Sequence, residues 1–69
     1  MDFDELENRF RHHEPTGTQP ERCVTIRDTG KRLASVIVQV TPESREQSLA
    51  LTKLEECIMW ANAAIARNE

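Results

Sequence analysis

The C-terminal part of the chain carries apolar residues at helical spacing. Between residues 42 and 68 they recur every three or four positions, which places them on one face of a helix. Thr41 is a suitable N-cap and Pro42 suits a first helical position, so we expect a helix over residues 42–68. The apolar stripe consists of Leu51, Leu54, Ile58, Ala61 and Ile65, flanked by Ala50, Cys57 and Ala64, with Trp60 and Ala63 further round. A surface this wide requires more than one packing neighbour.

A second stripe precedes it and alternates steps of three and four, which predicts a helix over residues 20–40. Gly30 lies on this stripe and costs about 1 kcal/mol relative to Ala, so it predicts close approach of two backbones. The β-branched end, SVIVQV, also has strand propensity, but no second strand exists to pair with it. The short turn near Val40 and Thr41 makes the two long helices antiparallel neighbours. The second stripe comprises Cys23, Ile26, Gly30, Leu33, Ile37 and Val40.

The N-terminal residues predict a short helix. Over residues 2–10, DFDELENRF, the apolar residues Phe3, Leu6 and Phe10 share one face. Residues 11–19 contain proline and glycine and are predicted to form a loop. We therefore expect an all-α fold in one domain over residues 1–69, an antiparallel helical hairpin with a short N-terminal helix. Two helices cannot cover this much apolar surface, so we expect a homo-oligomer.

Composition narrows the possible functions. The 69 residues carry a net charge of −3, which disfavours general DNA binding but permits a local basic pocket for a small anion. No apolar run is long enough to span a membrane, and the acidic N-terminus is unlike a signal peptide. Cys23 and Cys57 are interpreted as reduced core cysteines at similar depth in the hairpin, which could be neighbours.

The adjacent histidines His12 and His13 suggest a metal site, but no Cys or His at ligand spacing completes one. The sequence also contains no nucleophile elbow, P-loop or paired-carboxylate signature. We therefore predict neither a metal, a cofactor nor an enzymatic activity.

Basic residues gather in the loop, in the first half of the second helix and near the C-terminus. The hairpin brings these three regions toward one end. They could be ordinary surface charge, with Arg67 complementing the helix dipole, or a pocket for a phosphate-bearing ligand. In such a pocket arginine binds phosphate, Thr29 adds a hydroxyl and a histidine ring stacks on a base. The set is Arg9, Arg11, His12, His13, Arg22, Arg27, Lys31, Arg32 and Arg67.

The run TPESREQSLALTKLEECIMWANAAIARN, with NRF and an HxP-containing loop upstream, resembles the small phage anti-CBASS proteins that act as cyclic-oligonucleotide sponges. The resemblance covers nearly the whole chain from Asn8 onward. It implies helical hairpins assembled as homohexamers in the host bacterial cytoplasm. It also implies that they bind the messengers of bacterial CBASS defence without cleaving them. The implied ligands are cyclic dinucleotides such as 3′,3′-cGAMP, held between protomers, and cyclic trinucleotides at separate pockets.

The resemblance also implies roles for individual residues. The base-stacking aromatic falls at His12, where this chain has His in place of Tyr. The phosphate-binding lysine falls at Arg27, and the remaining implied ligand contacts are Thr29, Arg67 and, at the trinucleotide site, Arg11 and His13. The competing hypothesis is an oligomeric helical hairpin that binds a partner protein and no nucleotide.

Overall fold

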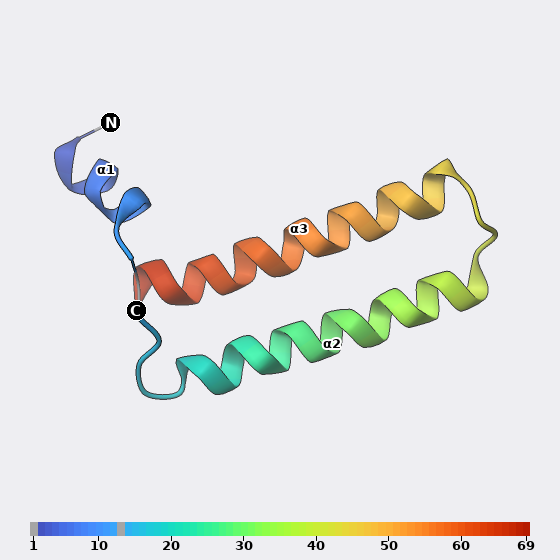
Figure 1. Ribbon diagram of the computed structural model, residues 1–69, viewed down its shortest axis with the longest axis horizontal. Coiled ribbons are helices and arrows are strands. Elements are labelled where there is room, and N and C mark those ends of the chain that lie inside the picture. The colour runs from blue at the N-terminus through green and yellow to red at the C-terminus, as the bar shows by residue number, and fades with distance from the viewer. Residues whose placement is uncertain (1, 13) are drawn as a thin grey trace.

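A computed structural model describes residues 2–12 and 14–69, and these residues form three α-helices with no strand. They are α1 over Phe3–Phe10, α2 over Gln19–Val40 and α3 over Arg45–Asn68. The helices α2 and α3 run antiparallel and pack against each other along their length (Figure 1). The prediction of an all-α helical hairpin with a short N-terminal helix is confirmed.

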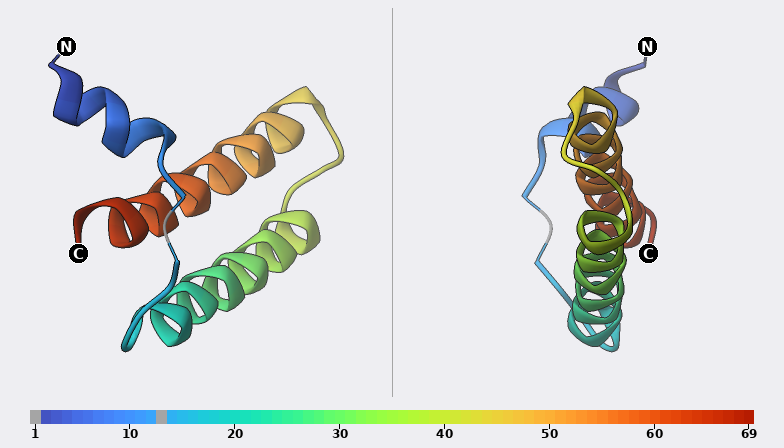
Figure 2. Two further views of the ribbon diagram at one scale, coloured as in Figure 1. Left: turned by 60° about the vertical axis from the view of Figure 1, so that its left-hand side comes forward. Right: turned by 90° about the vertical axis from the view of Figure 1, so that its right-hand side faces the viewer.

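The short helix α1 begins after Asp2, whose carboxylate accepts a hydrogen bond from the Glu5 amide at 2.7 Å. Its apolar face remains open, because Phe3 is 71% exposed and Phe10 is 83% exposed. In Figure 2, α1 projects away from the hairpin near the C-terminal end of α3. Packing against the hairpin therefore contributes little to this helix.

The turn between the long helices differs from the prediction. Thr41 is not the N-cap of α3. Its amide and its hydroxyl both donate to the Ile37 carbonyl, so it ends α2. Ser44 is the N-cap instead, since its hydroxyl accepts the Gln47 amide at 3.1 Å, and α3 begins at Arg45 rather than Pro42. The two hydroxyl residues divide the task, one closing each helix end that faces the turn.

The predicted stripe of α3 faces α2: Leu51, Leu54, Ile58 and Ala61 are half-buried and Ile65 is buried. The stripe of α2 follows a different course in its second half. Leu33 is 49% exposed and Val40 is 73% exposed, whereas Ala34 is half-buried. The contact line therefore runs from Gly30 through Ala34 to Ile37, and placing Leu33 and Val40 on it was wrong. A small residue beside Gly30 lets the helices stay close.

The hairpin is a single layer of two helices, and the principal extents of the whole chain are 46 × 29 × 12 Å. Seen end-on, α2 and α3 lie one above the other (Figure 2). Both broad faces of the layer are open to their surroundings. Within the described ranges, no helix combines the length and apolar character that a bilayer crossing requires.

Candidate functional site

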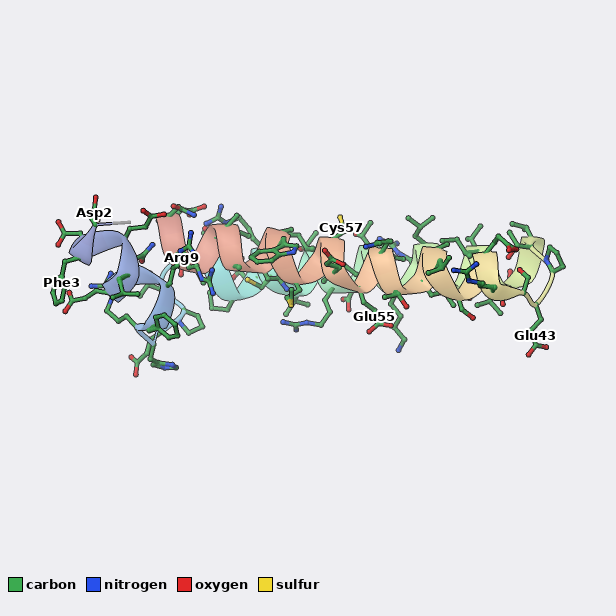
Figure 3. All side chains as sticks on the ribbon, turned by 90° about the horizontal axis from the view of Figure 1, so that it is seen from above. Asp2, Phe3, Arg9, Glu43, Glu55 and Cys57 are labelled. Atoms are coloured by element: carbon green, nitrogen blue, oxygen red, sulfur yellow. The ribbon has the colours of Figure 1, made fainter. Side chains whose placement is uncertain are left out.

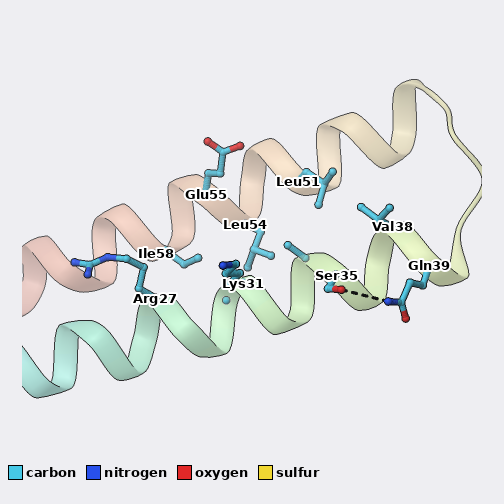
Figure 4. Close-up of a pocket in the computed structure, with 11 residues that line it drawn as sticks. Arg27, Lys31, Ser35, Val38, Gln39, Leu51, Leu54, Glu55 and Ile58 are labelled. Atoms are coloured by element: carbon cyan, nitrogen blue, oxygen red, sulfur yellow. Dashed lines mark hydrogen bonds between the residues drawn. The ribbon is translucent and has the colours of Figure 1, made fainter.

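Arg27 lies at the edge of a groove on one broad face of the hairpin. The groove encloses about 650 Å³. Arg27 and Lys31 of α2 and Glu55 of α3 stand around an apolar floor that includes Leu54 and Ile58 (Figure 4). We call it the Arg27 groove, and its lining is Arg27, Gly30, Lys31, Ala34, Ser35, Val38, Gln39, Leu51, Leu54, Glu55 and Ile58.

Thr29 lines a different, smaller groove of about 290 Å³, with Thr25, Ile26, Gly30, Leu33, Leu54, Cys57 and Ile58. Arg27 and Thr29 are two positions apart on a helix, so their side chains point roughly 200° apart around its axis. Figure 3 shows the two faces edge-on, with Glu55 of the Arg27 groove on one side and Cys57 of the smaller groove on the other. One copy of the chain therefore does not bring Arg27 and Thr29 to one ligand.

Cys57 is exposed and Cys23 is half-buried, and both are free thiols. The interpretation of both as core cysteines was therefore wrong for Cys57. Its position beside the contact stripe turns the thiol onto the open face that carries the smaller groove.

The basic residues differ in how far their charge is already neutralised. Arg22 is bound through both terminal nitrogens to the Glu69 carboxylate. This contact raises the pKa of Arg22 and lowers the pKa of Glu69, because each charged form stabilises the other. By contrast, Arg27, Arg11 and Arg67 are exposed and form no ion pair with any described residue. Arg22 thus leaves the set of cations that are open to a ligand.

The remaining predicted site residues lie outside both grooves. Arg11 and His12 directly follow α1 and are exposed, in the segment that leads to α2. Arg67 is exposed in the last turn of α3, at the end of the hairpin where α2 begins (Figure 1). His13 lies outside the described residues. The start of α2 and the end of α3 do meet at one end of the hairpin, as predicted. Arg27, however, lines the Arg27 groove, which lies further along α2.

Sequence reasoning missed Gln19. It was assigned to the loop, yet it is the first residue of α2 and is only 7% exposed. Its side chain contacts the loop and α3 together, accepting from the Thr16 amide and donating to the Ile65 carbonyl. An available signal was Pro20, since proline prefers the first turn of a helix and so places a residue just before it at the helix start.

No three His, Cys, Asp or Glu side chains gather closely enough to hold a metal ion in residues 2–12 and 14–69. What this part of the molecule offers is an unpaired arginine above an apolar floor, with a second cation one helical turn away. Such a surface suits a ligand that combines phosphate with flat, weakly polar rings.

The sequence profile of the Acb2/Tad1 hairpin domain matches residues 3–66, almost the entire chain. The chain belongs to the Acb2/Tad1 hairpin family. This is the family of anti-CBASS cyclic-oligonucleotide sponges, so the resemblance found in the sequence is confirmed. The match spans α1, the linking segment, α2 and nearly all of α3. No curated protein and no solved structure matches the chain. Membership of the Acb2/Tad1 family implies an anti-CBASS sponge role.

Proposed function

We propose that this protein sequesters the cyclic oligonucleotide messengers of bacterial CBASS defence in the cytoplasm of a phage-infected host. Cyclic dinucleotides such as 3′,3′-cGAMP would occupy one kind of pocket and cyclic trinucleotides another. The messengers would be held intact, away from their effector. The observation that carries the proposal is the match to the Acb2/Tad1 hairpin domain over residues 3–66.

The charge and location of Arg27 support a role in binding phosphate. Its guanidinium is exposed and unpaired among the described residues, and Lys31 follows one turn later on the same groove. Two cations on one edge suit the two phosphates of a cyclic dinucleotide, and a guanidinium can donate to a phosphate through two N–H groups. The groove volume of about 650 Å³ is within the usual range for small-molecule sites.

The opposed positions of Arg27 and Thr29 support a pocket built from two copies. A ligand that contacts both residue types would take Arg27 from one protomer and Thr29 from another. Such a pocket exists before the ligand arrives, so binding costs less ordering of the protein. His12 would add base stacking from the linking segment and Arg67 a further charge, while Arg11 and His13 would serve the trinucleotide.

The exposed apolar surface supports self-association, and we propose a homohexamer. Two helices leave both faces of the hairpin uncovered, and large apolar side chains on α2 and α3 are about half exposed: Val24, Leu33, Val36, Val38, Leu49, Met59 and Trp60. Exposed apolar surface in excess of scattered single residues marks protein–protein interfaces, so this many exposed apolar side chains on two helices favours association.

The test is calorimetric titration of the purified protein with 3′,3′-cGAMP and, separately, with cyclic tri-adenylate. Arg27→Ala should weaken dinucleotide binding by about 10- to 100-fold, because one charge-assisted hydrogen-bond pair is lost. The matched control is Arg45→Ala, which removes an exposed arginine at the start of α3 that is not among the residues lining the groove. Both variants should keep the helix content and the assembly of the parent protein.

Recovery of the intact ligand after protease digestion would support sequestration, and a linearised product would contradict it. If neither ligand gives a binding signal with the parent protein, the sponge proposal fails. The alternative, an oligomeric hairpin that binds a partner protein, would then be favoured.

A further inference from the structure

We propose that Gln19 is a positioning residue for the ligand site. It fastens the segment that carries Arg11 and His12 to the turn of α3 that carries Arg67. The inference rests on the proposed function, because it concerns residues that would contact the messenger. It assigns Gln19 no contact with the ligand itself.

Both ends of the Gln19 amide are used within a buried environment. Its Oε1 accepts from the Thr16 amide at 3.2 Å, and its Nε2 donates to the Ile65 carbonyl at 3.5 Å. Gln19 is 7% exposed and Ile65 is 9% exposed, so water does not compete freely for the bond between them, while the bond to Thr16 is partly buried. A buried amide is costly unless it is hydrogen-bonded, so the side chain is held in this orientation.

The backbone around Gln19 fixes the same turn. The backbone amide of Gln19 donates to the Thr16 carbonyl at 3.0 Å, which closes a tight turn over residues 16–19. Gly17 has φ +57° and Thr18 has φ −86° and ψ 0°, values that match a type II′ turn. Glycine adopts the positive φ at no steric cost. Thr16 and Gln19 are therefore joined by two hydrogen bonds, and the Gln19 side chain connects this turn to α3 through the Ile65 carbonyl.

The segment before this turn has few other ties to the hairpin. Across the described part of the chain, no hydrogen bond joins residues 11–18 directly to α3, and Gln19 links the two by bonding to Thr16 and to Ile65. Arg11 and His12 lie only four or five residues before Thr16, and Arg67 lies two residues after Ile65. Loss of the Gln19 contacts would let the segment move relative to α3, and binding would then require it to be ordered again.

The experiment compares Gln19→Met with the parent protein by calorimetric titration with 3′,3′-cGAMP and with cyclic tri-adenylate. Methionine keeps the length and the apolar stem but removes both hydrogen bonds. We expect affinity to fall about tenfold for at least one messenger, at unchanged helix content and assembly. Gln47→Met is the matched control, because the Gln47 side chain also makes two hydrogen bonds, both to Thr41 at the turn end of the hairpin, and Gln47 lines neither groove.

A double-mutant cycle separates positioning from general stability. If Gln19 acts by placing His12, the loss caused by Gln19→Met should shrink when His12 is already alanine. An equal loss in both backgrounds would overturn the inference, as would parent-like affinity of Gln19→Met.

Failure of the parent protein to bind either messenger would instead overturn the proposed function, so the two failures are distinguishable. If Gln19→Met does not fold, amide hydrogen exchange of the parent protein decides. The Thr16 backbone amide, which donates to the Gln19 side chain, should be protected, and exchange at the unprotected rate would refute the positioning role of Gln19.

Discussion

At the scale of single residues, Gly30 decides how closely the two long helices can approach. It is buried on α2 directly opposite Ile58 of α3. A methyl group at Gly30 would overlap the Ile58 Cδ1 atom and would lie 2.8 Å from Cγ1. The sequence-based prediction of a close approach at this glycine is confirmed. Glycine lowers the helix propensity of α2, and the apolar surface buried by the close contact offsets that loss of stability.

Gly30→Ala should therefore destabilise the protein despite the higher helix propensity of alanine. Ile58 is β-branched and its χ1 is restricted in a helix, so rotation about χ2 can move Cδ1 but leaves the Cγ1 atom in place. Overpacking of this kind costs about 1–3 kcal/mol, which outweighs the propensity gain of about 1 kcal/mol in all but its mildest form. Chemical denaturation monitored by circular dichroism measures the change.

The control is Gly30→Ala combined with Ile58→Val, which removes the overlapping Cδ1 atom. The double variant should lose less than the sum of the two single changes, because the residues are in contact. Strictly additive losses would show that the overlap is not the cause.

At the scale of the elements, the two ends of the hairpin are closed by different chemistry. At one end the turn itself connects α2 to α3, and Thr41 and Ser44 cap the two helix ends there. The open end relies on side chains, with Arg22 of α2 bound to Glu69 after α3, and Gln19 bound to the Ile65 carbonyl. The ion pair is exposed, so solvent screens it, and its contribution to the free energy of unfolding is small.

The stability contributed by the ion pair should depend on pH in one direction. Because Arg22 lowers the pKa of Glu69, the pair stabilises the fold above the unfolded-state pKa of a glutamate, about 4.3. That contribution disappears as the pH falls through the lower folded-state pKa. Glu69→Gln should therefore lower the thermal midpoint at pH 7 and have a much smaller effect at pH 3.

Thermal unfolding at both pH values measures this effect, with Glu14→Gln as the control for loss of an exposed carboxylate in the linking segment. The control should change the midpoint little at either pH. An effect of Glu69→Gln that is equally large at pH 3 would exclude the ion pair as its source.

At the scale of the whole molecule, a single layer of two helices cannot enclose a core. Ile65 is the buried large apolar residue within the described ranges, and the rest of the stripe is half-buried at best. A lone chain of this size buries too little apolar surface to be strongly stable. Association of further copies against the open faces would supply the missing burial, in agreement with the proposed hexamer.

The thermal midpoint should consequently rise with protein concentration. When folding is coupled to association, a tenfold increase in concentration adds about 1.4 kcal/mol per association step. For a domain of this length that corresponds to a rise of roughly 5 °C or more. Circular dichroism melts over a 100-fold concentration range, with sedimentation to identify the assembly, test this. A midpoint independent of concentration, with a monomeric sedimentation coefficient, would contradict self-association.

The sequence anticipated the helices well and the individual site less well. The stripe of α3 was placed correctly, because Leu51, Leu54, Ile58, Ala61 and Ile65 repeat at helical spacing without interruption. The course of α2 after Gly30 was not, because Leu33 and Ala34 are adjacent and spacing alone favours the larger apolar residue. Gln19 was missed because its burial and its role depend on a hydrogen bond to the Ile65 carbonyl, which lies far away in the sequence.

The amino-acid sequence was sufficient to predict the all-α hairpin, the antiparallel order of its helices and the close approach at Gly30, because each follows from local spacing, capping and short connections. It also determined the family, through the long specific run in α3. The folded structure was needed to show that Arg27 and Thr29 line two different grooves, that Arg22 is bound to Glu69, and that Gln19 joins the linking segment to α3. These facts depend on the rotation of one helix against another, and that rotation is set by side-chain packing between distant residues rather than by local pattern.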